Sequence, residues 1–266
     1  MSALRFYKYQ ATGNDFLIAD NRNGAYSSLT TEQIERLCDR RFGVGGDGLI
    51  LLEDIAGADF LMRYFNADGL LGSFCGNGAR CITRFAHLAG IVKNEYVFYA
   101  ADGKHLARLA SNGDVSVLMQ DAPEPQRHDQ ALFLDTGSPH LVLFVNDLDN
   151  TDVVSIGRTI RNSDRYRPKG TNVNFVQRTQ DPFTLQIRTY ERGVEDETYS
   201  CGTGAVAAAL ASAAEQAGLQ KISLHTKGGG LMVSFTKKEK DFSDIWLSGT
   251  AQLVFETSVD PQQLVS

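Results

Sequence analysis

Two cysteines in this chain open the same short motif, and they are the residues best suited to do chemistry. The motifs are Cys75-Gly76-Asn77-Gly78-Ala79 and Cys201-Gly202-Thr203-Gly204-Ala205. Each follows a strand-like run and begins a helix-like run, which places a thiol at the positive end of a helix. The helix dipole stabilises a thiolate there, and the first backbone N–H groups form a site for a carboxylate. A lone cysteine is usually a small core residue, but two in matching motifs indicate a functional pair.

A pair of opposed thiols can invert the configuration of an amino acid. One cysteine, as thiolate, would remove the α-proton, and the other, as thiol, would return a proton to the opposite face. Because a carbon beside a carboxylate is weakly acidic, N–H donors must stabilise the charge that develops on the carboxylate. Exclusion of water would strengthen those donors. No pyridoxal-lysine motif is present in the sequence, and we therefore expect no cofactor.

The chain repeats itself at a nearly constant offset. Thr12-Gly13-Asn14 recurs as Thr136-Gly137-Ser138, which is 124 positions further on, and the two motif cysteines are 126 positions apart. A period of this length indicates two related domains and not a solenoid, whose repeats are far shorter. The repeat therefore predicts two like halves, each of which contributes one thiol.

The predicted fold is α+β, with two pseudo-symmetric domains that each wrap mostly antiparallel strands around one central helix. We expect an N-terminal half over residues 1–120 and a C-terminal half over 121–266, although the last strand can return to the N-terminal half. The active site is expected in the cleft between them. Asp121–Gln130, with two prolines and several charges, is the best candidate for a linker.

Helices are expected after a capping box, over one helix-like stretch, and after each motif cysteine. Thr30 with Gln33 forms a capping box for a helix that runs to about Arg40, and a stretch over 152–161 is also helix-like. The helix after each motif cysteine is expected to stop at a glycine, Gly90 or Gly218. Alternating apolar residues predict strands at 4–9, 16–19, 49–53, 60–65, 96–100, 107–109, 115–119, 132–134, 141–145, 174–177, 185–190, 222–225, 231–235, 245–247 and 253–256.

A glycine pattern resembling the dinucleotide fingerprint lies at Gly43-Val44-Gly45-Gly46-Asp47-Gly48. That fingerprint needs a strand before the glycines and a helix after them. Here a helix precedes and a strand follows, so we reject a nucleotide site. A turn whose backbone passes close to another element explains the glycines better.

Composition excludes several classes of partner. The net charge is −6 and the pI is near 5.4, which argues against nucleic acid or an anionic membrane. The N-terminal segment lacks the apolar stretch of a secretory signal, so a cytoplasmic protein with reduced thiols is expected. The remaining cysteines, Cys38 and Cys81, are predicted to be structural. No second Cys or His pair stands at zinc-finger spacing, and no metal is expected.

The chain resembles the diaminopimelate epimerase family over nearly its whole length. The resemblance rests on ordered blocks, namely Gly13-Asn14-Asp15-Phe16, the glycine pattern at 43–48, Phe65-Asn66-Ala67-Asp68-Gly69, Cys75 to Cys81, Gly137-Ser138-Pro139-His140, Thr171-Asn172-Val173, Tyr190-Glu191-Arg192-Gly193, and Glu197 to Gly204. It implies interconversion of LL- and meso-diaminopimelate, in the synthesis of lysine and peptidoglycan precursors, without a cofactor. A homodimer is expected from the resemblance alone.

The resemblance also implies roles for individual residues. Cys75 and Cys201 match the acid/base pair, and His140 and Glu191 match positions that tune the thiols. The residues expected to bind substrate are Asn14, Asn66, Gly76, Asn77, Asn172, Glu191, Arg192, Gly202 and Thr203. Without the resemblance, the simpler interpretations are that His140 is a turn residue with its hydrogen bonds made locally and that Glu191 is a surface carboxylate. Asparagines in turns are more often turn formers than ligands.

Two alternatives remain open at this stage. A proline or hydroxyproline racemase would share the two thiols, but not the pattern of three asparagines with Arg192. A thiol redox or ligand-binding protein would more naturally carry Cys-x-x-Cys, which is absent. The chain departs from the family pattern at Gly48, at Ser138 and in the spacer 194–196, which affects substrate recognition more than the thiols. Two such sulfurs could also be joined by oxidation, with reversible loss of activity.

Overall fold

The computed structural model describes residues 3–213, 215 and 217–264, and the chain divides into two compact units. The first unit combines 1–117 with 250–266, and the second spans 118–249. The last long strand belongs to the first unit, where it pairs with the first strand. The sequence-based division into 1–120 and 121–266 stays a prediction.

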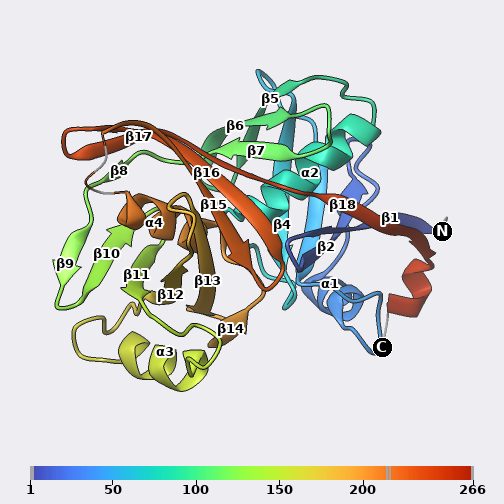
Figure 1. The fold of residues 1–266 in the computed structure, drawn as a ribbon. Helices are drawn as coiled ribbons and strands as arrows, with labels where there is room; N and C mark the ends of the chain where they lie inside the picture. Colours follow the sequence, from blue (N-terminus) through green and yellow to red (C-terminus); the bar gives the residue numbers. More distant parts are fainter. Residues whose placement is uncertain (1–2, 214, 216, 265–266) are drawn as a thin grey trace. The chain divides into compact units, whose positions relative to one another are not determined.

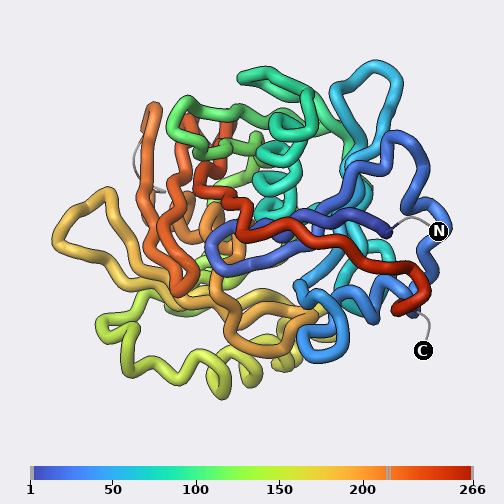
Figure 2. Tube along the Cα trace, turned by 90° about the vertical axis from the view of Figure 1, so that its right-hand side faces the viewer, coloured from blue at the N-terminus to red at the C-terminus, as the bar shows by residue number. Residues whose placement is uncertain are grey.

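Along the described residues, helices lie between groups of strands in the first unit before its C-terminal return (Figure 1). They are β1 (Leu4–Ala11), β2 (Asn14–Asp20), α1 (Thr31–Cys38), β3 (Gly48–Glu53), β4 (Phe60–Asn66), α2 (Gly76–Leu88), β5 (Glu95–Ala100), β6 (Gly103–Leu109) and β7 (Val115–Leu118). The chain returns to this unit as β18 (Gln252–Val259) and a short 3₁₀ helix, η1 (Pro261–Leu264). Figure 2 shows β18 running beside β1.

From β10 onward the second unit repeats this order of strands and helices, with β14 added; β8 and β9 precede the repeat. Its elements are β8 (Ala122–Pro123), β9 (Gln126–His128), β10 (Ala131–Asp135), β11 (Pro139–Phe144), α3 (Val153–Arg161), β12 (Asn172–Arg178), β13 (Thr184–Glu191), β14 (Asp196–Thr198), α4 (Gly202–Ser212), β15 (Gly218–Thr226), β16 (Gly229–Lys238) and β17 (Asp241–Gly249). The predicted α+β class and the repeat are confirmed by the strand pairing of the two units.

Strand pairing is the same in both units. From β1 to β7 the successive neighbours pair antiparallel, parallel, antiparallel, parallel, antiparallel and antiparallel. The series β10, β11, β12, β13, β15, β16 and β17 gives the same sequence of directions. Registers also agree, since Phe16 faces Gly48 in one unit and His140 faces Asn172 in the other. The offset in the sequence is therefore a structural equivalence.

One apolar helix lies at the centre of each unit. The α2 helix packs against β1, β2, β3, β4 and β6, and α4 packs against β10 to β13 and β15 to β17. Every α4 residue from Gly204 to Ala211 is buried. Both helices start where the sequence predicted, because a cysteine occupies the N-cap position and an apolar run follows. The α1 capping box between Thr30 and Gln33 is also confirmed.

The glycine turn before β3 agrees with the prediction of close backbone approach. A Cβ atom at Gly48 would lie 2.3 Å from the Phe65 carbonyl oxygen in the neighbouring strand. A helix, α1, precedes this turn and a strand follows it, which is the reverse of the dinucleotide-binding order.

Two predictions about connections are wrong. Asp121–Gln130 is not an open linker, because β8 pairs with β17 and β9 pairs with β10. Gly218 does not stop the helix after Cys201: α4 ends at Ser212, and Gly218 begins β15 with a φ of 89°. In both cases the backbone is used by a strand pairing that local sequence does not reveal. The short β14 was also not predicted.

Candidate active site

Each motif cysteine occupies the same local position in its own unit. Cys75 is the N-cap residue of α2 and Cys201 that of α4, with nearly identical extended backbone angles. Both side chains are half-buried, and neither of these described cysteines takes part in a disulfide. A helix leaves its first N–H groups without partners inside the helix, so each sulfur lies beside donors and the positive end of a dipole.

In the first unit the Cys75 thiol lies beside two asparagines, Asn14 and Asn77. The Cys75 sulfur lies 3.7 Å from Asn14 Oδ1, and it accepts a hydrogen bond from the Gly78 amide at 3.5 Å. Asn77 Nδ2 donates to the same Asn14 oxygen at 3.1 Å. Asp47 fixes the orientation of Asn14, because its carboxylate accepts from Asn14 Nδ2 at 2.6 Å. The predicted residues Asn14, Cys75 and Asn77 therefore form one cluster.

A buried arginine supports that cluster. Arg80, on α2, is fully buried, and its Nη2 donates to Asn77 Oδ1 at 3.0 Å and to Thr12 Oγ1 at 3.1 Å. Among the residues that the structure describes, Arg80 Nε and Nη1 have no hydrogen-bond partner. Burial lowers the pKa of Arg80, and the nearby Cys81 and Cys75 thiols act in the opposite direction when ionised. Sequence reasoning missed this residue, because an arginine in a helix is normally a surface charge.

Asn66 lies at the end of β4, opposite Gly48. Its backbone N–H donates to the Leu70 carbonyl at 2.9 Å. Its side-chain oxygen lies 3.0 Å from the position that a Cβ of Gly72 would take. The role of Asn66 in substrate binding stays a prediction.

In the second unit Cys201 is connected to the buried His140 through Thr203. The Cys201 sulfur lies 3.5 Å from Thr203 Oγ1, which in turn lies 2.8 Å from His140 Nε2. Burial, helped by the charge of Arg192, lowers the pKa of His140 to about 3. His140 is thus a neutral imidazole at physiological pH. Gly202 and Thr203 form the first turn of α4, as Gly76 and Asn77 form that of α2.

The second unit also brings Asn172 and Arg192 together. Asn172 Oδ1 accepts from the Arg192 backbone N–H at 2.8 Å, while its Nδ2 donates to Ser138 Oγ at 2.8 Å and to the Pro139 carbonyl at 3.0 Å. The Arg192 guanidinium donates to the Lys169 carbonyl at 3.2 Å. Ser138 thus contacts Asn172 through its hydroxyl group.

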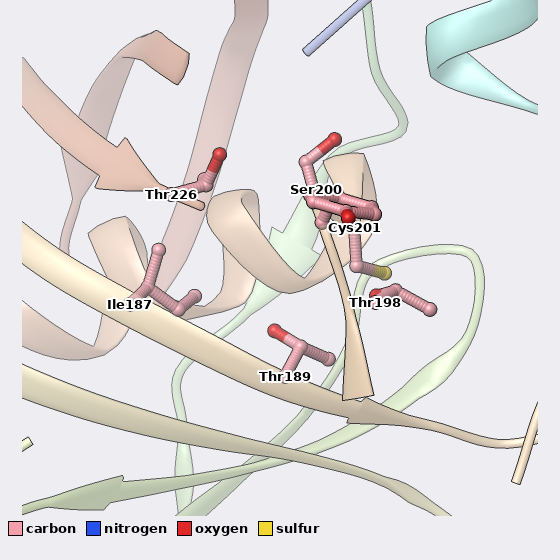
Figure 3. A pocket seen from close by; sticks show the side chains of 7 residues that line it. Ile187, Thr189, Thr198, Ser200, Cys201 and Thr226 are labelled. Carbon is pink, nitrogen blue, oxygen red and sulfur yellow. The ribbon is translucent and has the colours of Figure 1, made fainter. Parts of the chain in front are cut away.

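A shallow depression lies beside Cys201 (Figure 3). Its lining is mostly hydroxyl groups and includes Thr189, Thr198 and Ser200. Glu191 reaches this lining, since its Oε2 accepts from Thr198 Oγ1 at 3.0 Å. Glu191 is therefore connected to the surroundings of Cys201 within this unit, and not merely a surface charge.

The other two cysteines lie in apolar surroundings. Cys38 is buried in a cluster with Leu37 and Leu49, and burial raises the pKa of its thiol to about 12. Cys81 is fully buried on α2, and burial raises its pKa as well. Both thiols stay protonated at neutral pH, which agrees with the predicted structural roles.

Comparison with known proteins decides the family. The family model for diaminopimelate epimerase matches residues 6–124 and 132–254. The chain belongs to the diaminopimelate epimerase family. A relative of that name from Flavobacterium psychrophilum is 48% identical over 257 residues, which cover 96% of this chain and 100% of the relative.

Solved structures share the fold of this family member at low sequence identity. A phenazine biosynthesis protein of the PhzF family from Bacillus anthracis superposes with a TM-score of 0.76 at 17% identity, covering 98% of this chain and 100% of the other. A hydroxyproline epimerase from Agrobacterium vitis gives 0.68 at 14% identity and covers 98% and 94%. These similarities show the fold alone. None of the described helices is both long and apolar enough to cross a membrane.

The state of His140 gives a testable dependence of stability on pH. The unfolded chain binds a proton at His140 near the ordinary pKa of 6.5, and the folded chain only near 3. Stability from this residue is therefore complete above pH 6.5 and falls as the pH drops toward 3. We expect His140→Phe, which copies Phe16 of the first unit, to remove this loss.

Urea unfolding at pH 7 and pH 5 measures the effect. Between these values the wild type should lose about 2 kcal/mol more of its unfolding free energy than His140→Phe does. Carboxylates contribute equally to both proteins and cancel in the difference. Parallel losses in the two proteins would show that folding does not lower the pKa of His140.

Proposed function

We propose that this chain is a cofactor-independent epimerase that interconverts LL-2,6-diaminopimelate and meso-2,6-diaminopimelate, in the biosynthesis of lysine and peptidoglycan precursors. The observation that carries the proposal is the matched pair of half-buried cysteines, each capping the central helix of one unit. The name of the Flavobacterium psychrophilum relative supports the choice of substrate.

The proposed reaction needs only the two thiols and backbone donors. One cysteine, as thiolate, takes the α-proton, and the electron pair of the broken C–H bond moves into the adjacent carboxylate. The N–H groups at the starts of α2 and α4 stabilise this enediolate-like charge. The electron pair then returns to carbon and takes a proton from the thiol of the other cysteine on the opposite face. Each turnover exchanges the protonation states of Cys75 and Cys201.

The remaining predicted residues are assigned to substrate binding and tuning. We assign Gly76, Asn77, Gly202 and Thr203 to the carboxylate at the reacting carbon. Asn14, Asn66, Asn172, Glu191 and Arg192 are assigned to the amino groups and the distal carboxylate. A guanidinium can bind that carboxylate through two parallel hydrogen bonds. His140 and Glu191 are also assigned to tuning the thiols.

The proposal includes a setting for the enzyme. We propose a cytoplasmic homodimer that needs neither metal nor pyridoxal phosphate. Each chain has the two halves 1–120 and 121–266, and its last strand returns to the first half. Reduced thiols are required for the reaction, which the cytoplasm maintains. Oxidation that joins Cys75 to Cys201 is expected to stop turnover until a reductant is added.

Solvent hydrogen exchange tests the reaction class. Incubation of the enzyme with LL-diaminopimelate in heavy water should place deuterium at the α-carbon of the meso product. The same measurement with L-proline and trans-4-hydroxy-L-proline distinguishes the competing racemase. Label in proline but not in diaminopimelate would show that the enzyme is a proline racemase and not a diaminopimelate epimerase. Inversion without label would exclude proton abstraction altogether.

A further inference from the structure

A buried polar network lies behind His140 in the second unit. Asn174, on β12, is completely buried. Its Nδ2 lies 3.1 Å from His140 Nδ1 and donates to the Leu141 carbonyl at 3.1 Å. Its Oδ1 accepts from Thr189 Oγ1 at 3.0 Å. The first turn of α4 packs closely against this side chain, since a Cβ at Gly204 would lie 2.4 Å from Asn174 Oδ1.

The first unit shows that the fold does not require this network. The strand registers place Phe16, Ile50 and Tyr64 at the positions of His140, Asn174 and Thr189. The same architecture is thus built there with a phenylalanine and an isoleucine. Burying polar groups costs free energy unless every partner is provided. The network in the second unit therefore indicates a role other than packing.

The hydrogen bonds fix which atom of His140 carries the proton. The Thr189 hydroxyl and the Leu141 carbonyl orient the Asn174 amide so that its NH₂ group faces His140 Nδ1. Nδ1 must then accept, and a neutral imidazole carries its hydrogen on the other nitrogen, Nε2.

The proton on Nε2 determines the direction of the next hydrogen bond. Nε2–H then donates to Thr203 Oγ1 at 2.8 Å, which leaves the hydroxyl hydrogen available to the Cys201 sulfur at 3.5 Å. Asn172 Nδ2 also lies 3.5 Å from Nε2, but it makes shorter bonds to Ser138 and Pro139. Donation from His140 to Thr203 is therefore retained.

We propose that Asn174 is a positioning residue that holds His140 as the neutral Nε2–H tautomer, so that the Thr203 hydroxyl donates to Cys201 and stabilises its thiolate. This inference rests on the proposed function, because it describes how one of the two proposed acid/base thiols is kept ionised. The charged and titratable groups around the network are Arg192, which disfavours an imidazolium at His140, and Glu191 and Tyr199 beside Cys201.

The tautomer and the thiol can both be measured without substrate. In the wild type, ¹H–¹⁵N correlations of the imidazole ring should show hydrogen on Nε2 of His140. The pH dependence of iodoacetamide alkylation, resolved for each cysteine by mass spectrometry, reports the apparent pKa of Cys201. In Asn174→Leu we expect that pKa to rise by about one unit, as expected for loss of one hydrogen bond to a charged group, with Cys75 unchanged.

Substitutions at Thr203 separate the hydrogen bond from structural damage. Thr203→Val, which keeps the shape, should raise the apparent pKa of Cys201 as Asn174→Leu does, and Thr203→Ser should restore it. Thr159→Val, at an exposed hydroxyl on α3, is the control and should change nothing. An Nδ1–H tautomer in the wild type would overturn the proposal even if every variant failed to fold. An unchanged Cys201 pKa in folded Asn174→Leu and Thr203→Val would also overturn it.

The test is independent of turnover. If the network behaves as expected but heavy water places no label in diaminopimelate, the proposed reaction fails and the role of Asn174 stands. If label is found but the Cys201 pKa does not respond, the reaction stands and the role of Asn174 fails.

Discussion

Replacing either Cys75 or Cys201 by serine is expected to lower kcat for diaminopimelate epimerisation by about 10²- to 10⁴-fold, the usual contribution of a positioned acid or base. Serine keeps the size and the helix-capping position of each residue. Its hydroxyl is far too weak an acid to provide an anion at neutral pH. Conversion of LL- to meso-diaminopimelate, followed by chiral chromatography, measures the loss.

A buried cysteine provides the matched control. Cys38→Ala should keep kcat within a few-fold, because the Cys38 thiol is packed against Leu37 and Leu49 and stays protonated. Its cost should be seen in stability, at about 1 kcal/mol for a small cavity. Full activity in Cys75→Ser, or in Cys201→Ser, would end the two-thiol mechanism.

Replacing the buried Arg80 by methionine is expected to change stability and activity in opposite directions. The Arg80 guanidinium is fully buried, and within the described chain two of its nitrogens lack a hydrogen-bond partner. Exchanging such a charge for an apolar side chain of similar length should stabilise the fold by about 1–4 kcal/mol. The hydrogen bond from Arg80 that holds Asn77 is lost, which should lower kcat by about 10- to 100-fold.

Urea unfolding and steady-state kinetics on the same preparation test this opposition. Arg84→Met, at a half-buried position one turn along α2, is the control and should leave kcat unchanged. A destabilised Arg80→Met with normal kcat would show that Arg80 is a structural residue and that Asn77 is held in other ways.

The central helices and the duplication could be predicted because their signals are local or periodic. A cysteine, two glycines and an apolar run suffice to place the starts of α2 and α4. The offset of 124 positions seen in the sequence is also the distance between Phe16 and His140, which occupy matching registers in the two units. Family resemblance then added His140 and Glu191, whose chemistry depends on neighbours distant in sequence.

The remaining features depend on tertiary structure. Asp121–Gln130 has the composition of a linker, yet it contains short strands that pair with β17 and β10. Arg80 lies in a predicted helix and Asn174 in a predicted strand, and only the fold shows that both side chains are buried. Asparagine is uncommon in strands, which was the one local sign that Asn174 is unusual.

The pairing of β18 with β1 has a consequence for synthesis of the chain. Leu4 is paired with Val259, so the first unit cannot complete its sheet until residue 259 has left the ribosome. During translation the outer edge of β1 is exposed, and an unpaired edge invites association with other chains. Nascent molecules are therefore expected to depend on chaperones until the final strand has been made.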